Sequence, residues 1–543
     1  MRCSLPTRNS RRILCVFPAY APSFGTFSNS YPLFGRVRAF MPPQGLLLIA
    51  AYMPEHWAVR FVDENIQPAS AADLAWADAV FVSGMHIQAP QIHDIGRRAK
   101  AAGKVTALGG PSVSGAPEMY PDFDYIHVGE IGDGTDRLIA TLDDDCTPPP
   151  APVRFDTAER LPLPDFPIPA YHLVRLDRYM LGSLQFSSGC PYRCEFCDIP
   201  ALYGRQPRLK TPEQLAAELD AIVAQKGYPS FIYFVDDNFI GNRKATREML
   251  PHLIEWQRKR GHPLRFGCEA TLNIAKQTEI LSLMRQAEFQ TVFVGIETPE
   301  VDALKHMRKE QNASLPMLEG IDTINKYGME VTSGIILGLD TDSADTEERL
   351  KTFIDAANVP ILTINLLQAL PKTPLWDRLK RDGRVVADDA GLESNVVFLR
   401  PYDEVVAMWR RCIEYAYAPE RLFKRYAHQV EATYANRLVG PVRGKLNWTN
   451  ISLMLVLMFN IIRRIGIAAD YRRSFWKAVL PALRRGQIDA AMSMGIVGHH
   501  LITFSREALR GEQNASFYSA QTRRSMAATA PPPAAFAKLR KSG

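Results

Sequence analysis

Three cysteines in one short loop constrain this chain more than any other feature. Cys190, Cys194 and Cys197 lie in the run Ser-Gly-Cys-Pro-Tyr-Arg-Cys-Glu-Phe-Cys-Asp, with the spacing C-x3-C-x2-C. Cysteine thiolates are the usual ligands of iron–sulfur clusters, and three of them can hold three irons of a four-iron (4Fe-4S) cluster. The fourth iron is then open to a small molecule. The spacing therefore predicts a cluster with a chemical role, because a cluster that only carries electrons normally has four protein ligands.

The alternatives for this loop are a zinc knuckle and buried structural thiols. Structural zinc takes four Cys or His ligands, and no fourth candidate follows closely in the sequence. The remaining cysteines are scattered along the chain, which is not the pattern of a disulfide framework. We therefore expect a protein of the reducing cytoplasm.

Length and charge set wide bounds on the chain. A sequence of 543 residues is long enough for two to four domains. Its net charge of +6 is weak evidence for nucleic-acid binding, which we do not expect, and suits an anionic membrane surface equally well. Apolar runs of 18 or more residues do not occur in the sequence, so we expect no membrane-spanning helix.

The N-terminal part alternates short apolar runs with helical stretches, which predicts a doubly wound, Rossmann-like α/β domain over residues 11–142. Several of the expected strands end in glycine or polar residues. Ligands of such sheets bind beyond the carboxyl ends of the strands, where glycine lets the backbone approach them closely. The expected strands are residues 12–17, 59–63, 79–84, 105–108 and 125–128.

A second series of strand–helix units follows a Pro- and Asp-rich segment, residues 143–179, that is expected to be an extended linker. The series predicts a partial (β/α) barrel over residues 180–385. Its expected strands are residues 184–187, 231–235, 264–268, 291–295, 330–336 and 361–367, and polar residues at their ends are Asp236, Asp237, Asn238, Glu269, Glu297 and Thr298. Each acidic residue alone is equally compatible with a helix cap or a salt bridge. Cys268 points away from the side of Glu269 and is expected to be a core thiol.

The C-terminal part has a helical pattern over residues 386–520, and residues 521–543 are expected to be a disordered tail. Residues 451–462 are nearly apolar and are followed by Arg463, Arg464, Arg472 and Arg473. The apolar run is too short to span a bilayer. It fits a membrane-interface helix, and it fits a buried core helix with a basic outer face equally well.

The cysteine loop resembles that of the radical S-adenosylmethionine (SAM) enzymes, whose barrel has six strand–helix units. The resemblance implies that SAM chelates the open iron through its amino and carboxylate groups and is cleaved to a 5′-deoxyadenosyl radical. It implies that Phe196 lies beside the adenine. It also implies that the strand-end residues Asp236, Asp237, Glu269 and Glu297 hold the methionyl and ribose parts, with Gly338 against the adenine. The turn Pro371-Lys372-Thr373-Pro374-Leu375 resembles a Pro-Gly-Thr-Pro-Leu turn of that family, with Lys372 in place of glycine.

The N-terminal part resembles the cobalamin-binding domain that precedes the barrel in many radical SAM methyltransferases. The matching runs are Pro42-Pro43-Gln44-Gly45-Leu46, Leu108-Gly109-Gly110-Pro111 and Val128-Gly129-Glu130. A generic flavodoxin-like domain with tight turns is the alternative. The resemblance implies cobalamin contacts by Pro43, Gly45, Ser83, Gly84, Gly109, Gly110, Gly129 and Glu130.

One histidine in this part, His93, lies in a run similar to a cobalt-ligating motif, and a second, His86, is a candidate only to lie near the ligand. Cobalamin domains that ligate cobalt use the motif D-x-H-x-x-G after the first strand, whereas His93 lacks the aspartate and follows the third expected strand. We therefore interpret His93 as a surface or packing residue and expect no cobalt ligand from this motif. His86, at a strand end, is a weak candidate to lie near the ligand.

The layout as a whole resembles the cobalamin-dependent (class B) radical SAM methyltransferases, and among them the bacterial hopanoid C-2 methylases. The resemblance implies that hydrogen is removed from an unactivated ring carbon, C-2, and that the carbon radical takes a methyl group from methylcobalamin. The implied partners are a hopanoid or other polycyclic lipid and an electron donor such as ferredoxin or flavodoxin. The implied location is the cytoplasm, with peripheral contact to the inner face of the cytoplasmic membrane. The alternatives are a similar enzyme for another lipid, tetrapyrrole or natural product, and a non-enzymatic cluster or cobalamin sensor.

Overall fold

The computed structural model describes residues 10–313, 315–386, 392–438 and 448–511, and it divides into two compact units. The first unit comprises Met1–Ala21, Arg38–Pro191 and Asp198–Pro229. The second unit comprises Pro22–Val37, Tyr192–Cys197 and Ser230–Gly543. Two short segments therefore leave the unit that surrounds them in sequence, and one of them carries two of the three loop cysteines.

The first unit is built on a six-stranded parallel sheet with the order β2-β1-β3-β4-β5-β6. The chain order reverses between β1 and β3, which is the topological switch point where ligands of such sheets bind. The five strands predicted from the sequence are confirmed to within one residue at each end. The strands are β1 (Arg12–Phe17), β2 (Ala58–Asp63), β3 (Ala79–Ser83), β4 (Val105–Gly109), β5 (Tyr125–Val128) and β6 (Val153–Asp156).

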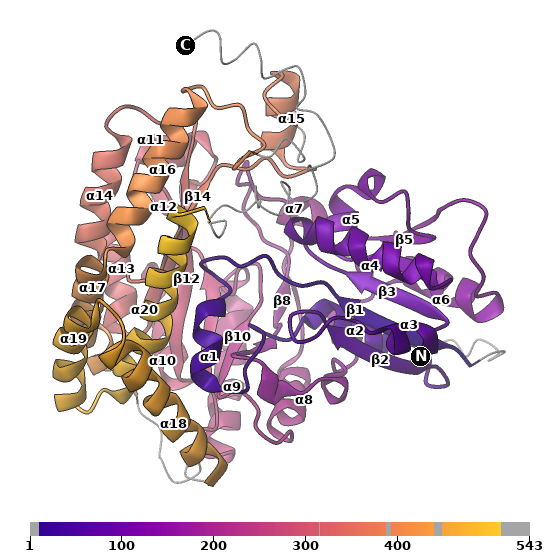
Figure 1. The fold of residues 1–543 in the computed structure, drawn as a ribbon, viewed down its shortest axis with the longest axis horizontal. Coiled ribbons are helices and arrows are strands. Elements are labelled where there is room, and N and C mark those ends of the chain that lie inside the picture. The colour runs from indigo at the N-terminus through magenta and orange to yellow at the C-terminus, as the bar shows by residue number, and fades with distance from the viewer. Residues whose placement is uncertain (1–9, 314, 387–391, 439–447, 512–543) are drawn as a thin grey trace. The chain divides into compact units, whose positions relative to one another are not determined.

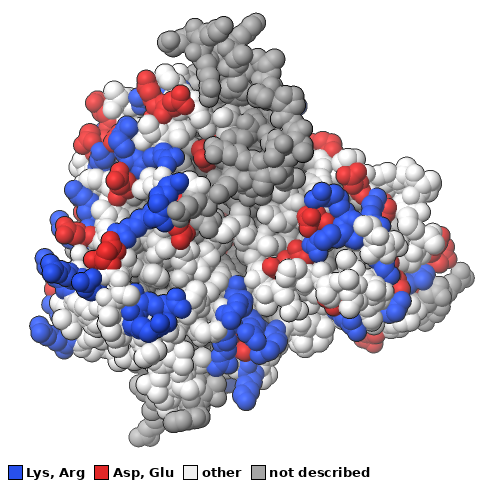
Figure 2. Space-filling model, in the orientation of Figure 1, with Lys and Arg blue, Asp and Glu red and all other residues white. Residues whose placement is uncertain are grey.

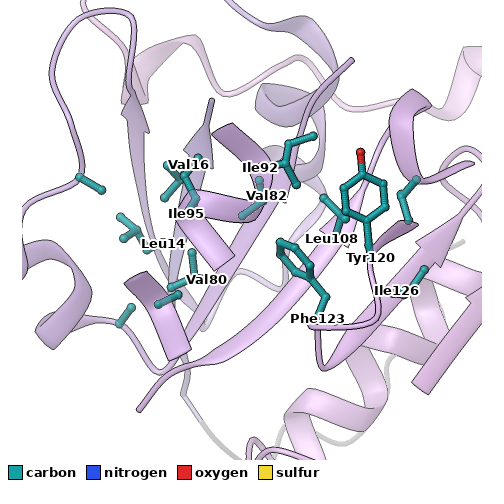
Figure 3. Packing of buried hydrophobic residues seen from close by; sticks show 14 of the residues in the cluster. Leu14, Val16, Val80, Val82, Ile92, Ile95, Leu108, Tyr120, Phe123 and Ile126 are labelled. Carbon is teal, nitrogen blue, oxygen red and sulfur yellow. The ribbon is translucent and has the colours of Figure 1, made fainter. Parts of the chain in front are cut away.

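Helices cover this sheet because its inner strands, β1, β3, β4 and β5, are buried on both faces, as in most parallel sheets. Figure 3 shows one of the two resulting cores, in which Val80 and Val82 of β3 face Ile92 and Ile95 of the following helix. The helices are α2 (Gln44–Tyr52), α3 (Ala71–Trp76), α4 (Ala89–Ala101), α5 (Pro111–Gly115) and α6 (Asp133–Asp144).

The sixth strand, β6, was not predicted, because it lies in the segment interpreted as an extended linker. The N–H of Val153 donates to the carbonyl of Asp124 at 2.8 Å and begins the pairing of β6 with β5. Phe155 is the buried residue of this strand, and its neighbours are exposed. An edge strand with one buried residue gives no alternating pattern that a sequence could reveal.

The rest of the first unit contains short elements around the cysteine loop. They are β7 (Gly182–Leu184), β8 (Ser187–Ser188), α7 (Ile199–Leu202), β9 (Arg208–Leu209) and α8 (Pro212–Val223). Thr211 caps α8, with its hydroxyl accepting from the N–H of Gln214 at 3.2 Å. These elements fix the chain on either side of the loop.

The second unit contains five successive parallel strands, each followed by helical structure, which correspond to the second to sixth strands predicted for the barrel. The first predicted strand, residues 184–187, is wrong as a single strand, because β7 ends at Leu184 and β8 begins at Ser187. Four phenylalanines, Phe234, Phe239, Phe266 and Phe289, pack together beneath the sheet with ring centres 5.1–5.5 Å apart. The strands are β10 (Phe231–Phe234), β11 (Arg265–Ala270), β12 (Phe289–Glu297), β13 (Glu330–Leu337) and β14 (Leu362–Leu366). The longer helices among them are α9 (Arg243–Lys259), α10 (Thr278–Gln286), α13 (Met317–Lys326), α14 (Thr346–Ala357) and α15 (Pro374–Arg381).

Helices complete the second unit, as the sequence predicted for the C-terminal part (Figure 1). Trp409 joins them to the sheet, because its Nε1 donates to the carbonyl of Ile364 in β14 at 2.8 Å. The elements are α16 (Tyr402–Tyr417), α17 (Pro419–Ala432), α18 (Trp448–Ile461), the π-helix η10 (Ile462–Ile467), α19 (Arg472–Arg484) and α20 (Ile488–Leu509). In the described ranges no helix is both long and apolar enough to cross a membrane. The expected tail, residues 521–543, lies outside them.

The segment Pro22–Val37 packs on these helices although the first sheet surrounds it in sequence. Phe24 stacks on Tyr417 with ring centres 4.7 Å apart. Nε2 of His500 in α20 donates to the carbonyl of Ser23 at 3.1 Å, while Nδ1 accepts from the N–H of Asn29. Helix α1 (Tyr31–Phe34) of this segment lies beside α18.

Candidate active site

The cysteine loop begins at a glycine that the backbone requires. Gly189 has φ = 98°, in the left-handed region, and a Cβ there would lie 3.0 Å from the carbonyl oxygen of Gly204. The N–H of Cys190 donates to that carbonyl at 3.2 Å. The first cysteine is therefore held by the backbone that follows α7.

The second and third cysteines lie in the second unit and meet polar N–H groups. The N–H of Cys197 donates to the carbonyl of Cys194 at 3.2 Å, and Nε2 of Gln311 donates to Sγ of Cys194 at 3.3 Å. None of the thiols of Cys190, Cys194 and Cys197 forms a disulfide with a described residue, and all three residues are partly exposed. Iron–sulfur clusters need reduced, accessible thiolates, and an N–H donor near sulfur, as Gln311 provides for Cys194, stabilises them; the residues of this loop therefore fit the predicted cluster.

Glu195, between these two cysteines, is held at three points. Its N–H donates to the carbonyl of Met307 at 2.9 Å, and its carbonyl accepts from the N–H of Leu375 at 3.0 Å. Its carboxylate accepts from Nε of Arg378 at 2.6 Å, and Arg378 also pairs with Asp340 at 2.7 Å. These contacts therefore hold the loop between Cys194 and Cys197 in one conformation.

Lys309 is a buried cation beside these thiols. It pairs with Glu297, and the two side chains are 7% and 10% exposed. Burial alone would lower the pKa of Lys309, but Glu297 and then the thiols of Cys194 and Cys197 raise it above its ordinary value. Its ammonium lies 5.5 Å from the ring centre of Phe196. A permanent positive charge therefore favours negative charge on the groups at this end of the loop.

The carboxyl ends of β10, β11 and β12 bring four predicted SAM residues together. Asp236 and Asp237 follow β10, Glu269 lies in β11, and Glu297 ends β12. The pKa of Glu269 is raised to about 7, first by burial and then by Asp237 and Glu297, against the opposing effect of Lys309. Glu269 is nevertheless an exposed residue, so solvent moderates the effect of these neighbours on its charge. These charges therefore share one edge of the sheet.

Asn238 adds a buried polar group that the protein leaves unsatisfied. Its side chain is 2% exposed, yet neither Oδ1 nor Nδ2 finds a hydrogen-bond partner among the described residues. Buried amides are almost always hydrogen bonded, and leaving one unbonded costs about 1–3 kcal/mol. Because Asn238 follows Asp236 and Asp237 directly, a polar ligand at this edge would satisfy it. The hydroxyl, amino and carboxylate groups of SAM fit that requirement.

Glu297 has a strained backbone. Its φ is 65°, in the left-handed region, and the register with β13 shifts between Gly295 and Glu297. A Cβ at Gly295 would lie 2.7 Å from Nζ of Lys309 and would overlap the Glu297 carboxylate. Strained non-glycine residues cost on the order of 1–3 kcal/mol and cluster at functional sites. The Glu297–Lys309 pair therefore depends on a bulge and a glycine as well as on charge.

Gly338, expected beside the adenine, is required by local packing. Its φ is 85°, and a Cβ there would overlap the ring of Phe398. The carboxylate of Asp342 accepts from the N–H groups of Gly338 and Leu339 at 2.7 and 3.1 Å. Burial raises the pKa of Asp342 to about 6, although these hydrogen bonds oppose the shift. Contact between Gly338 and SAM stays a prediction.

The predicted cobalamin residues follow strand ends of the first sheet or begin α2, and their glycines differ in what surrounds them. The set comprises Pro43 and Gly45 at the start of α2, Ser83 and Gly84 at the end of β3, Gly109 and Gly110 at the end of β4, and Gly129 and Glu130 after β5. A Cβ at Gly110 would overlap Ser83, and one at Gly84 would lie 2.9 Å from a proline ring. No described atom lies within 4 Å of a Cβ at Gly45, and the nearest to one at Gly109 is 3.9 Å away. Gly45 and Gly109 therefore leave room for a ligand to approach the backbone.

Glu130 is engaged in ion pairs within the first unit. Its carboxylate pairs with Arg208 at 2.5 Å and Arg160 at 3.2 Å, and it accepts from the hydroxyl of Ser188 at 3.2 Å. Ser188 precedes the cysteine loop by one residue. Glu130 therefore ties the edge of the first sheet to the start of the loop, and its contact with cobalamin stays a prediction. Sequence reasoning did not identify this structural role.

His93, whose run is similar to the cobalt-ligating motif, and His86, the candidate to lie near the ligand, both follow β3 in the chain. His93 lies in α4, and its ring stacks on Tyr120 with centres 4.9 Å apart. Burial lowers the pKa of His93, and it is a packing residue, as predicted. His86 follows β3. Burial raises the pKa of Asp198, the residue after Cys197, and the electrostatic effect of His86 partly opposes that rise.

Two further sequence expectations concern residues beside the SAM edge. Cys268 is fully buried in β11, and burial raises the pKa of its thiol well above the ordinary value, which confirms a core thiol. Lys372 has φ = 65°, so at the position of the family turn's glycine the backbone takes the left-handed conformation that favours glycine.

Sequence reasoning missed the polar residues that follow β12. Lys309, Gln311 and Asn312 all face the site, and Nδ2 of Asn312 donates to the carbonyl of Gly295 at 2.6 Å. They lie in and beside the charged run Met307-Arg308-Lys309-Glu310, which is typical of a solvated helix end. No signal in that pattern distinguishes a buried lysine from an exposed one.

Comparisons with known proteins agree with this geometry. The radical SAM superfamily matches residues 184–354, and a domain of unknown function (DUF4070) matches residues 373–514. The chain is 59% identical over 516 residues to the hopanoid C-2 methylase of Rhodopseudomonas palustris (strain TIE-1), with 95% of this chain and 98% of the relative covered. It is 33% identical over 548 residues to an uncharacterized methyltransferase of Synechocystis sp. (strain ATCC 27184 / PCC 6803 / Kazusa), with 97% and 98% covered.

Among solved structures, the cobalamin-dependent S-adenosylmethionine radical enzyme OxsB, with aqua-cobalamin and S-adenosylmethionine bound, has a similar fold. The TM-score is 0.60 at 16% sequence identity, and the match covers 93% of this chain and 84% of that chain. The shared architecture therefore extends over both units and beyond the residues that the superfamily matches.

Proposed function

The chain belongs to the hopanoid C-2 methylase family of radical SAM proteins, and from that membership we propose that it adds a methyl group to ring carbon C-2 of hopanoid lipids. The observation that carries the proposal is the similarity to a hopanoid C-2 methylase over almost the full length of both chains. Such similarity covers the predicted cobalamin domain, the barrel and the helical C-terminal part together.

The residues of this chain fit the three groups that the reaction requires. Cys190, Cys194 and Cys197 would hold the 4Fe-4S cluster. SAM would lie along the edge that carries Phe196, Asp236, Asp237, Glu269, Glu297 and Gly338, where the unsatisfied amide of Asn238 supports a polar ligand. Cobalamin would lie against the edge that carries Gly45 and Gly109, where open space supports a large ligand. When bound, the cluster and SAM supply hydrogen-atom abstraction, and cobalamin supplies the methyl group.

The protein's own residues orient these groups and control charge around them. Lys309 keeps a positive charge beside Cys194 and Cys197, and its pairing with Glu297 fixes the position of that carboxylate. A carboxyl oxygen of Glu269 can hold a proton near neutral pH, because the pKa of this group is about 7. Arg378 keeps the loop between the cysteines in one conformation through Glu195. We assign positioning roles to Lys309 and Arg378 on this basis.

The proposed substrate also implies partners and a location. A hopanoid is nearly insoluble in water, so the enzyme would take it from the bilayer as a peripheral protein on the cytoplasmic face of the membrane. The reductant would be a small electron carrier such as ferredoxin or flavodoxin. Neither partner is needed for the cluster and SAM to bind, so the two can be tested separately.

Deletion of the gene in its host, followed by mass spectrometry of the membrane lipids, tests the proposal. We expect 2-methylated hopanoids to disappear and their unmethylated precursors to remain. Wild-type gene on a plasmid should restore them, and the Cys194→Ala variant should not. Unchanged hopanoids together with a missing methyl group on another lipid or a tetrapyrrole would favour the alternative substrates, and unchanged methylated metabolites of every class would favour a sensor.

A further inference from the structure

Helix α18 and the π-helix η10 present an apolar stripe to solvent. Leu455, Phe459, Ile462 and Ile467 are 60%, 65%, 41% and 65% exposed. Soluble proteins expose single apolar residues often, but a continuous row of large ones marks a contact surface. We call these four residues the α18 stripe.

The opposite side of the same helix is already packed. Leu457, Ile461 and Ile465 are at most 8% exposed, and Ile461 packs 3.0 Å from the position that a Cβ at Gly495 of α20 would take. Because this inner row supplies the contacts that α18 needs to fold, the α18 stripe has no part in the core of the described chain.

The π-helix keeps the stripe on one side. A π-turn has i→i+5 hydrogen bonds, so residues five apart lie above one another, whereas in an α-helix they point to different sides. Ile462 and Ile467 are five apart and bound η10. An α-helix continued through this segment would turn Ile467 away from Phe459. π-turns are rare and are often found at functional sites.

Three polar contacts fix the orientation of this element. Nδ2 of Asn460 donates to the carbonyl of Leu33 at 2.9 Å, and Nε1 of Trp476 donates to the carbonyl of Gly466 at 2.9 Å. The N–H of Ala468 donates to the carbonyl of Arg463 at 3.2 Å and closes the π-turn. The stripe is therefore presented in a set orientation.

The charge around the stripe is strongly positive. Residues 451–488 contain seven Lys or Arg and a single acidic residue, Asp470, so this segment alone accounts for a charge equal to the +6 of the whole chain. Asp470 pairs with Arg506 of α20. In Figure 2 the visible surface over α18 is mostly uncharged (white), and Lys and Arg (blue) lie beside it over α19. An apolar row with a basic border is the pattern of helices that lie in the interface of an anionic bilayer.

We propose that the α18 stripe inserts into the acyl region of an anionic bilayer, with Arg463, Arg472 and Arg473 at the level of the lipid phosphates. The inference deepens the proposed function, since it names the face through which a membrane lipid would be approached. A second copy of this chain fits the stripe less well, because a symmetric contact would place arginine against arginine.

Co-sedimentation of the reconstituted full chain with vesicles containing phosphatidylglycerol tests the proposal. We expect Phe459→Gln to lower the vesicle partition coefficient about tenfold, because a buried phenylalanine contributes on the order of 1.5–3 kcal/mol. Arg463→Gln should lower it roughly fivefold, and added salt should weaken wild-type binding. Leu399→Gln is the matched control, because Leu399 is 66% exposed but lies away from α18 in sequence, and it should leave partitioning unchanged.

A depth measurement keeps the proposal testable if a variant folds poorly. Phe459→Trp should give added fluorescence that brominated acyl chains quench, and Leu399→Trp should not. Wild-type protein that ignores phosphatidylglycerol vesicles at low salt, or equal partitioning of Phe459→Gln and wild type, would overturn the proposal. So would a shift from dimer to monomer caused by Phe459→Gln. Methylation of a detergent-dispersed hopanoid, measured for wild type and Phe459→Gln, separates the two proposals. If neither protein methylates the hopanoid, only the proposed function is overturned.

Discussion

The carboxyl edges of the two parallel sheets have opposite chemistry. At the edge of the first sheet, the residues proposed to meet the ligand are mostly glycines, and Gly45 and Gly109 leave open space. At the edge of the second sheet, the proposed residues are charged, and Glu269 and Glu297 lie close enough to Lys309 to affect one another's charge. The same topology thus sets where a ligand binds but does not set how it is held.

The difference predicts how each edge responds to mutation. A glycine that only makes room acts through shape, so its replacement should lower the affinity for the ligand without changing the protonation of neighbouring side chains. A buried charge acts through electrostatics, so its replacement should change stability, pH dependence or the properties of neighbouring groups. The predictions below test whether the two edges are separable in this way.

Loss of a loop cysteine should have the largest effect, and at one edge only. Cys194→Ala removes the ligand of one iron, so we expect the cluster to be lost and SAM cleavage to fall to background. Cobalamin binding at the first edge should remain. Iron analysis, chromatography of 5′-deoxyadenosine and the cobalamin absorbance spectrum measure the three quantities.

Cys412→Ala provides the matched control, because Cys412 is a free, fully buried thiol of α16. It should keep the cluster and SAM cleavage. If Cys194→Ala still cleaves SAM, the cluster assignment is wrong. If it loses cobalamin as well, the two edges are not separable.

Removal of the buried cation should have the next largest effect. Lys309→Met leaves Glu297 buried without a partner, which typically costs about 3–5 kcal/mol of the free energy of unfolding. The double variant Lys309→Met/Glu297→Gln should recover most of that loss, because it leaves no unpaired charge. Urea unfolding of the apo-protein measures both.

The corresponding ion pair of the first unit supplies the comparison. Arg208→Met removes one partner of Glu130, but Arg160 remains and the Arg208 side chain is 26% exposed, against 7% for Lys309. We expect a cost of about 1 kcal/mol. Equal losses in the free energy of unfolding for Lys309→Met and Arg208→Met would show that the ion pair of the second edge is no more sensitive to the loss of a partner than that of the first.

Most of the fold could be predicted from sequence, because parallel strands are short apolar runs that end at glycine or polar residues. The five predicted strands of the first sheet are such apolar runs, and several of them end at glycine or polar residues, whereas only Phe155 of β6 is buried. The packing of Pro22–Val37 on the C-terminal helices could not be predicted either. It depends on contacts such as Phe24 with Tyr417, which are nearly 400 residues apart and leave no local pattern.

The candidate site divides in the same way. The loop cysteines and the strand-end carboxylates could be found because their chemistry is visible in type and spacing. Lys309 could not, because its burial follows from the bulge at Glu297 and the space left by Gly295. The pairing of Glu130 with Arg208 was also hidden, since the two residues come from different elements.

Filling open space at the first edge should have a moderate effect. Gly45→Ala adds a methyl group that touches no described atom, and alanine favours the helix α2, so the stability of the apo-protein should stay equal or rise by up to about 1 kcal/mol. If the ligand approaches the backbone there, the methyl group should weaken cobalamin binding about tenfold. Absorbance titration with cobalamin measures the affinity.

Gly115→Ala is the control for this change, because Gly115 likewise lies in the terminal turn of a helix of the first unit and likewise has open space around it. It should leave cobalamin affinity unchanged. Equal affinity for cobalamin in Gly45→Ala and wild type would place the ligand elsewhere on the edge. A change in the affinity of either variant for SAM would show that the two edges are coupled.

The smallest expected effect is a pH dependence confined to the second edge. Because the pKa of Glu269 is raised from its ordinary 4.5 to about 7, the folded chain holds a proton that the unfolded chain has already lost. Its contribution to stability is therefore fully present below about pH 4.5, falls as the pH rises toward 7, and is constant above that.

Glu269→Gln removes this slope, so the difference in thermal midpoint between variant and wild type should shift in favour of the variant from pH 5 to pH 7. Because Glu269 is an exposed residue, the change should stay below about 1 kcal/mol. Asp237→Asn should reduce the slope without removing it, since it takes away one of the charges that raise this pKa. A difference between Glu269→Gln and wild type that stays constant from pH 5 to pH 8 would show that the pKa of Glu269 is not raised in the folded chain.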